Sequence, residues 1–343
     1  MDAQYILIFF AIISATVCYL GLRQISTHES ISVYIQLGWQ KRFPNTKLRH
    51  VTDPIVKLCL FSCALFTIIL TFAIAAVLII ETIHFFQFVS VPDFLFGLRW
   101  SPSKGDGFFG FLPLLMGTLL VTGIAMLIAI PIGIYAALYT SQYMSKSNRS
   151  IVKPIMEVLA GIPTVVFGFI ALIVVSPLIQ KIGTLIGLSV ASESALGVGI
   201  VIGIMVIPYI TSLSDDVITA VPKALRDSSL AMGATMSESV KKVVLPAAMP
   251  GVTAAVLLAM SRAIGETMIV VMAAGYSANL TANPLESVTT VTVQIVSQLT
   301  GDQEFNSSKT LVAFALGLAL FIITFIINFL ALRVVNKYRE KYA

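Results

Sequence analysis

The sequence predicts an all-α polytopic membrane protein, and three observations carry that prediction. Of the 343 residues, 57% are hydrophobic and only 11% are charged, whereas soluble domains contain about 25% charged residues. The mean hydropathy is +0.93, so a soluble fold would leave large apolar patches in water. Seven apolar runs are each long enough to cross the roughly 30 Å hydrocarbon core as a helix.

Segments that contain charged, glycine or proline residues separate the seven runs. The predicted membrane spans are Tyr5–Leu22, Val56–Ile83, Phe109–Tyr139, Ile155–Ile179, Ala195–Leu213, Val252–Gly275 and Leu311–Val334. No positive charge precedes the first run, which favours a membrane anchor over a cleavable signal peptide. The polar segment 24–54 that follows either lies on the inner membrane surface or forms a plain linker. The third run is long enough to tilt or to begin outside the bilayer.

The basic residues assign a side to each connecting segment. Of the 22 Lys and Arg residues, 17 follow the first, third, fifth and seventh runs, and four lie on the opposite side. Cytoplasmic segments of membrane proteins carry the excess of Lys and Arg. We therefore expect the N-terminus outside the cell and the C-terminus in the cytoplasm. The net charge of +5 then reflects orientation rather than binding of nucleic acid.

The sequence lacks the common motifs of catalysis. No GxxxxGK[ST] phosphate-binding loop occurs, so the chain itself is not expected to hydrolyse ATP. There is no HExxH motif, the three histidines are scattered, and Cys18, Cys59 and Cys63 lack the spacing of metal ligands. We expect no catalytic residue, no metal site and no cofactor in this chain.

The remaining positive charge, Arg262, lies inside the sixth predicted span. About ten residues into a helix, it would be ~15 Å deep, where an arginine costs roughly 2.5–3.5 kcal/mol. Glu266 follows at i+4 and would share its helix face. One interpretation is an ion pair that only holds helices together. The other is an anion-handling point in a water-lined path, because the planar guanidinium donates two parallel hydrogen bonds to an oxyanion.

The neighbouring carboxylate suggests a hypothesis about selectivity. A carboxylate repels sulfate, but it can accept a hydrogen bond from the proton of hydrogen phosphate. Arg262 would then supply attraction, and Glu266 would discriminate against fully ionised oxyanions.

The connection between the fifth and sixth spans, residues 214–250, is too long for a structureless loop. Its pattern predicts two short helices, Asp227–Met232 and Ser237–Val244. Gly233 would stop the first helix in a left-handed conformation, and Leu245–Pro246 would end the second. Two short helices hinged at a glycine would form a compact knob on the cytoplasmic side.

The knob resembles the EAA motif of binding-protein-dependent ABC importer permeases: Glu-Ala-Ala, three residues, Gly, nine residues, Ile-x-Leu-Pro. Here aspartate replaces glutamate, two serines replace the alanines and valine replaces isoleucine, with the spacing intact. The corresponding residues are Asp227, Ser228, Ser229, Gly233, Val243, Leu245 and Pro246. The resemblance implies that this knob docks in a groove of a separate ATPase subunit, which binds the ATP and Mg.

Within that family, the chain is similar to PstC-type phosphate permeases over about residues 95–335. The matching stretches are Leu98–Pro102, Phe111–Thr118, Ile130–Gly133, Glu157–Phe169 and Arg262–Met268. The resemblance implies an ABC importer permease domain with six helices over 56–343, to which 1–55 adds an extra helix and a basic cytoplasmic segment. The candidate residues of the transport path are Glu157, Pro163, Thr164, Arg262, Glu266 and Thr267. A proline inside the fourth span would either free a backbone carbonyl for that path or only kink the helix.

The resemblance also implies the partners of the chain. These are a PstA-like second permease subunit, an ATP-binding ATPase dimer and an external phosphate-binding protein, assembled in the bacterial cytoplasmic membrane. Two alternatives remain: a permease of the same class for molybdate or sulfate, and an ion-coupled anion carrier. The chain shows no clear internal repeat of the kind common in such carriers.

Overall fold

The computed structural model describes residues 46–102, 107–300 and 307–339. The chain divides into two compact units, residues 1–72 and 73–343, and the boundary falls inside helix α3 (Thr46–Phe85). In the first unit, the part of α3 over 56–72 exposes all of its side chains, as expected of a helix that faces lipid or a partner. The predicted span Tyr5–Leu22 and the expected position of the N-terminus lie outside the described residues.

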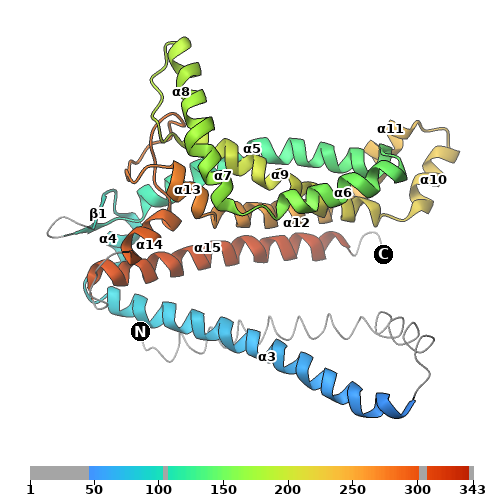
Figure 1. The fold of residues 1–343 in the computed structure, drawn as a ribbon, viewed down its shortest axis with the longest axis horizontal. Helices are drawn as coiled ribbons and strands as arrows, with labels where there is room; N and C mark the ends of the chain where they lie inside the picture. Colours follow the sequence, from blue (N-terminus) through green and yellow to red (C-terminus); the bar gives the residue numbers. More distant parts are fainter. Residues whose placement is uncertain (1–45, 103–106, 301–306, 340–343) are drawn as a thin grey trace. The chain divides into compact units, whose positions relative to one another are not determined.

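The second unit is built from helices and one short antiparallel hairpin (Figure 1). Its α-helices are α4 (Val91–Phe96), α5 (Leu112–Leu138), α6 (Lys146–Ala160), α7 (Thr164–Ile170), α8 (Ser176–Leu185), α9 (Ala195–Thr219), α10 (Lys223–Ala231), α11 (Met236–Ser239), α12 (Leu245–Ile264), α13 (Met268–Ala273), α14 (Val291–Leu299) and α15 (Ser308–Arg339). Its π-helices are η1 (Tyr139–Tyr143), η2 (Ala171–Val175) and η3 (Val240–Val244). The hairpin pairs β1 (Trp100–Ser101) with β2 (Phe108–Phe109).

Six helical segments of the described chain are long and apolar enough to cross a membrane. They are Val56–Phe85, Leu112–Tyr143, Thr164–Leu185, Ala195–Thr219, Met236–Ile264 and Ser308–Val335. The second, third, fifth and seventh predicted spans each overlap one of them almost completely, which confirms those spans. The fourth and sixth were placed wrongly, and both errors come from a break in the helix.

The fourth prediction, Ile155–Ile179, runs across such a break. Helix α6 ends at Ala160, Gly161 follows it, and α7 begins only at Thr164. Pro163 takes the position before α7, because a proline lacks an N–H and keeps the preceding residue out of helical geometry. The span therefore consists of α7, η2 and α8, and the proline lies at its start rather than inside it.

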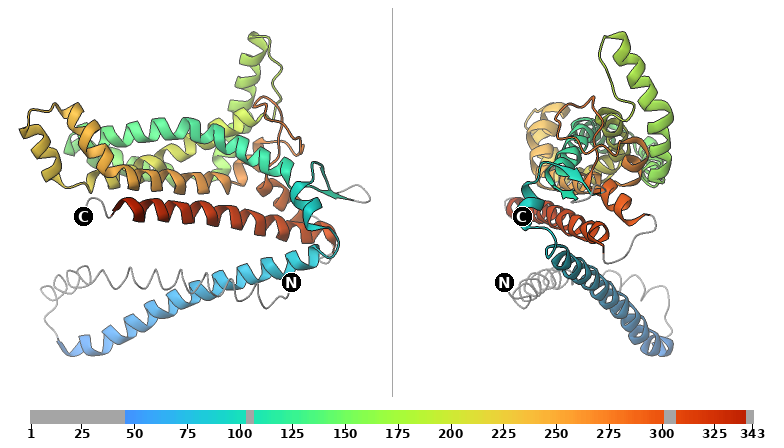
Figure 2. Two further views of the ribbon diagram at one scale, coloured as in Figure 1. Left: turned by 180° about the vertical axis from the view of Figure 1, so that it is seen from behind. Right: turned by 90° about the vertical axis from the view of Figure 1, so that its left-hand side faces the viewer.

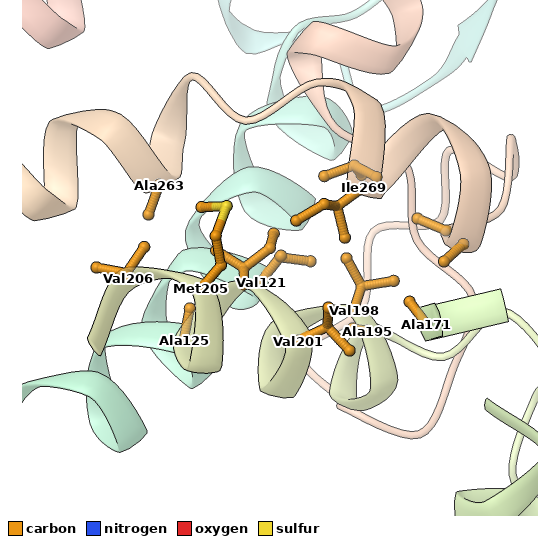
Figure 3. Packing of buried hydrophobic residues seen from close by; sticks show 14 of the residues in the cluster. Val121, Ala125, Ala171, Ala195, Val198, Val201, Met205, Val206, Ala263 and Ile269 are labelled. Carbon is orange, nitrogen blue, oxygen red and sulfur yellow. The ribbon is translucent and has the colours of Figure 1, made fainter. Parts of the chain in front are cut away.

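The core of the second unit lies between α5 and α9 (Figure 3). Val121 and Ala125 of α5 pack against Val198 and Met205 of α9, and all four are buried. Gly203 permits this approach, since an added Cβ would lie 3.0 Å from the carbonyl oxygen of Ala125. Residues of α12, α13 and η2 complete the same cluster. These helices form a closely packed frame that fixes the positions of the breaks described below.

Two smaller clusters close the opposite ends of this frame. One is aromatic and joins Phe85, Phe94 and Phe109 to α14 and α15. The other joins Ala137 and Ile218 to the start of α12. Figure 1 and the left view of Figure 2 agree with this separation, with α10 and α11 at one end and α14 at the other. The knob and the polar segment around α14 therefore lie at opposite ends of the second unit.

Candidate functional site

The segment that contains Arg262 is a break between two helices, not a continuous span. Helix α12 ends at Ile264, Gly265 caps it, and α13 begins at Met268. The predicted helix Val252–Gly275 was wrong in this respect. Arg262 lies in the last turn of α12, and Glu266 lies beyond its end, so the two side chains do not share a helix face.

Glu266 explains why the chain turns here. Its side chain is buried, and Oε1 accepts the backbone N–H groups of Thr267 at 3.2 Å, Met268 at 3.2 Å and Ile269 at 3.4 Å. These N–H groups open α13 and would otherwise have no partner. A carboxylate at the start of a helix also interacts favourably with the helix dipole. Glu266 therefore stabilises the break itself.

A second layer of buried polar residues holds the same break from the side of α14. The hydroxyl of Thr292 donates to the carbonyl oxygen of Glu266 at 2.9 Å. At the first residue of α14, the N–H of Val291 donates to the hydroxyl of Thr118 on α5 at 3.1 Å. Further along α14, Gln294 accepts the indole N–H of Trp100 at 2.8 Å. Buried polar groups need such partners, and here they connect the break to three other elements.

Arg262 itself has an aromatic neighbour, Tyr209, and no acidic one within the part of the chain that the structure describes. Its side chain is exposed, and its guanidinium carbon lies 5.7 Å from the ring centroid of Tyr209 on α9. Within the described ranges, no carboxylate lies in ion-pair contact with Arg262, and Glu266 uses its Oε1 for α13 instead. The alternative of a neutralising Arg262–Glu266 pair is therefore wrong.

The other candidates for the path fall on α6 and α7. Thr164 is the first residue of α7, which packs against α13: the Cα of Ile269 would lie 3.2 Å from a Cβ on Gly168. Glu157 is exposed in the last turn of α6. It lines an open groove of about 370 Å³ together with Lys146, Arg149, Ser150, Lys153 and Pro154. Thr164 thus belongs to an element beside the break, whereas no hydrogen bond or ion pair among the described residues joins Glu157 to it.

The knob has the two predicted helices, but the first begins at Lys223 rather than Asp227 and the second does not end where predicted. Helix α10 ends before Gly233, whose φ of +89° confirms the left-handed stop. Thr235 and Glu238 then form a capping box that starts α11. The prediction that Leu245–Pro246 ends the second helix was wrong. The chain continues through η3 into α12, and Pro246, which has no N–H to donate, lies where the π-helical turn gives way to the α-helix.

The two serines of the motif add a contact between the short helices. The hydroxyl of Ser229 on α10 lies 2.5 Å from the hydroxyl of Ser239, which is fully buried at the end of α11. Ser228 bonds back to its own helix through the carbonyl of Ala224, and Asp227 stays exposed beside Arg226. Val243, Leu245 and Pro246 lie on the continuous helix that leads away from the knob.

Comparison with known proteins now identifies the class of the chain. Residues 129–340 match the model of the family described as "Binding-protein-dependent transport system inner membrane component". The chain belongs to this family. The permease is 34% identical over 304 residues to the probable ABC transporter permease protein YqgH of Bacillus subtilis, covering 88% of this chain and 95% of that protein.

Other relatives of the permease have names that state a substrate. It is 31% identical to the phosphate transport system permease protein PstC of Haemophilus influenzae, over 81% of this chain and 92% of that protein. Among solved structures, a bacterial ABC transporter involved in the import of the acidic polysaccharide alginate matches with a TM-score of 0.59. That match covers 84% of this chain and 99% of the other at 16% identity, so it establishes the ABC permease fold alone.

Sequence reasoning missed one polar cluster of the permease, at the C-terminal end of α9. Asp215 is buried there, with Oδ2 2.7 Å from a guanidinium nitrogen of Arg149 and 3.7 Å from Nζ of Lys153. Its Oδ1 accepts the hydroxyl of Thr140 at 3.0 Å. The cluster fastens α6 and η1 to α9. Two features of the sequence could have indicated this cluster. Asp215 and Asp216 come at the end of an apolar helix, and Arg149 and Lys153 are spaced i and i+4 on a preceding segment.

Lys153 also bonds to the neighbouring Asp216. This hydrogen bond raises the pKa of Lys153 above its ordinary value of 10.5, against the opposing effect of burial. Because the pKa is higher in the folded state, the stabilisation is fully present below about pH 10.5 and is lost as the pH rises through the folded-state value. The attachment of α6 is therefore intact throughout the physiological range.

Proposed function

We propose that this chain is the transmembrane permease subunit of an ATP-driven importer of inorganic phosphate. The observation that carries the proposal is Arg262, a guanidinium at a helix break with no carboxylate partner in the described chain. Its planar fork of donors suits the oxygens of phosphate. The relatives named as phosphate transport permeases support the same substrate.

In this proposal, Glu266 also helps to select the substrate through its second carboxylate oxygen. All three backbone bonds go to Oε1, so Oε2 is left to accept the proton of hydrogen phosphate. Fully ionised sulfate offers no such proton and would be repelled. Arg262 then attracts the oxyanion, and Glu266 selects the protonated one. Thr267, Thr164 and Pro163 complete the proposed path beside the break, and Glu157 on α6 belongs to a separate part of that path.

The motor of this importer is another chain. A partner ATPase dimer binds ATP and Mg, and this subunit contributes no catalytic residue. The knob of α10 and α11 docks on that ATPase through the positions Asp227, Ser228, Ser229, Gly233, Val243, Leu245 and Pro246. A PstA-like permease forms the other half of the path, and an external phosphate-binding protein delivers the substrate. The chain lies in the bacterial cytoplasmic membrane among lipids, with its N-terminus outside and its C-terminus in the cytoplasm.

Reconstitution tests the whole proposal. The chain, its partner permease and the ATPase are placed in proteoliposomes, and uptake of radiolabelled phosphate is measured with and without the external binding protein. We expect uptake that requires ATP and the binding protein. Uptake without ATP or partners would instead support an ion-coupled carrier. Equal uptake of molybdate or sulfate would overturn the choice of substrate.

Two variants test the roles within the site. Arg262→Gln should abolish most uptake while the complex still assembles, and normal uptake by this variant would make Arg262 structural. Glu266→Gln keeps an oxygen that can accept the bonds of α13. It should therefore fold, yet it should discriminate less between phosphate and sulfate. Unchanged selectivity in Glu266→Gln would contradict the role given to its carboxylate.

A further inference from the structure

The contact between Arg262 and Tyr209 is not explained by packing of the apolar core. Arg262 is exposed and Tyr209 is half-buried, yet the guanidinium carbon lies 5.7 Å from the centroid of the ring. This distance is within the range in which an aromatic face attracts a cation. A flexible, exposed arginine pays conformational entropy to stay in one place, so this contact gives Arg262 a defined position.

Both backbones that carry the pair are fixed by the frame of the unit. Tyr209 follows Pro208 on α9 and packs against the central apolar cluster. Ala263, the neighbour of Arg262, is buried in the same cluster from the side of α12. The ring therefore presents a rigid surface, and the guanidinium is the mobile partner that the ring orients.

The chemistry of the contact differs from that of an ion pair in one decisive way. A carboxylate would neutralise the arginine and occupy its N–H donors. An aromatic face attracts the cation through the ring quadrupole and takes no hydrogen-bond donor. The donors in the guanidinium plane and the full positive charge remain available to an oxyanion. Glu266, the nearest acidic residue in sequence, is held at the start of α13 instead.

We propose that Tyr209 is a positioning residue for the transported oxyanion, holding the guanidinium of Arg262 in place while leaving its charge and donors free. This inference rests on the proposed function and deepens it. It predicts that the ring of Tyr209 matters and that its hydroxyl does not, because the attraction comes from the ring face.

Uptake kinetics of inorganic phosphate in proteoliposomes of the complete importer provide the first test. Tyr209→Phe keeps the ring and should leave KM within about twofold of wild type. Tyr209→Leu removes the ring and should raise KM roughly 3- to 30-fold, with a smaller effect on maximal rate. Tyr135→Leu is the matched control, because Tyr135 on α5 is 74% exposed; its KM should not change. Equal KM values for the Phe and Leu variants would overturn the inference.

A second measurement is independent of transport. In protein labelled with 15N-arginine, the Nε–H resonance of Arg262 is identified as the one missing from Arg262→Gln. The ring current of Tyr209 should shift this resonance, so Tyr209→Leu should move it and Tyr209→Phe should leave it near its place. An unmoved resonance in Tyr209→Leu would overturn the contact itself. If wild-type importer takes up no phosphate while the resonance moves as expected, the proposed function fails and the contact stands.

Discussion

At the scale of single residues, Asp215 makes the densest set of polar contacts near the end of α9. Its carboxylate is buried and faces Arg149, Lys153 and Thr140. Removing its charge takes the ion-pair partner from Arg149 and leaves Lys153 with Asp216 alone, which is more costly in a partly buried place than losing an exposed ion pair.

We predict that Asp215→Asn lowers the free energy of unfolding by roughly 1–3 kcal/mol. Thermal unfolding of the detergent-solubilised protein would show a lower midpoint, and protease would cut the segment around α6 sooner. Asp216→Asn is the control, since Asp216 is 58% exposed and its loss should cost less. A larger effect in Asp216→Asn would contradict the central place given to Asp215.

Single residues also show where sequence reasoning reaches its limit. Gly233 could be predicted as a left-handed stop, because the pattern of a short helix followed by glycine is local. The function of Glu266 in starting α13 could not be predicted. It depends on the break between α12 and α13, and the continuous apolar run in the sequence gives no sign of that break. Asp215 and Tyr209 were missed because their partners lie far away in the sequence, and only the packing of helices brings them together.

At the scale of elements, the contact of α5 with the segment before α14 depends on the absence of a side chain. A Cβ added to Gly117 would lie 2.1 Å from the carbonyl oxygen of Thr289. That backbone precedes Thr292, which bonds to Glu266. A displaced segment at this point would loosen the break that carries the proposed path.

Gly117→Ala should therefore destabilise the protein by roughly 1–3 kcal/mol. Gly123 lies on the same helix with nothing within 4 Å of the added Cβ. Gly123→Ala should be neutral or stabilise by up to about 1 kcal/mol, because alanine is the better helix former. Thermal midpoints of the two variants in detergent give the comparison, and equal midpoints would be evidence against close packing at Gly117.

The knob permits a prediction about coupling to the motor. Gly233→Ala forces an L-residue into a left-handed conformation at a cost of about 1–2 kcal/mol and should distort the angle between α10 and α11. In the reconstituted importer, we expect lower phosphate uptake for each ATP hydrolysed. Gly187, with φ +73° and open space around it, is the matched control beyond α8. Gly187→Ala should introduce a similar backbone strain but keep the normal phosphate uptake for each ATP hydrolysed. An equal loss of coupling in both variants would contradict a special role for Gly233.

At the scale of the whole molecule, hydropathy predicts that the membrane spans exist better than it predicts where each span begins and ends. Four of the six spans in the described chain overlap a predicted run almost throughout, whereas Thr164–Leu185 and Met236–Ile264 overlap their predicted runs only in part. The span Met236–Ile264 starts earlier than predicted because the knob leads into it without interruption. Helix α11 and the π-helix η3 contain serine, glutamate and two lysines and so carry little apolar signal, which is why hydropathy alone does not assign them to the span.

The orientation of the chain is testable with single cysteines in a variant without Cys18, Cys59 and Cys63. Ala282 lies in the exposed connection before α14, and Ala231 lies exposed on α10. An impermeant maleimide should label Ala282→Cys in intact cells and Ala231→Cys only after the membrane is opened. The reverse pattern would invert the orientation expected from the basic residues.

The unbroken passage from the knob to Arg262 has a mechanical consequence. Met236–Ile264 comprises 29 residues, so at 1.5 Å per residue it is a rod about 43 Å long. If one end of such a rod is held, a tilt of about 5° moves the other end by about 4 Å, which exceeds the length of a hydrogen bond. A tilt of this size imposed at α11 is thus large enough to make or break the contacts of the anion that we propose to bind the guanidinium at the far end.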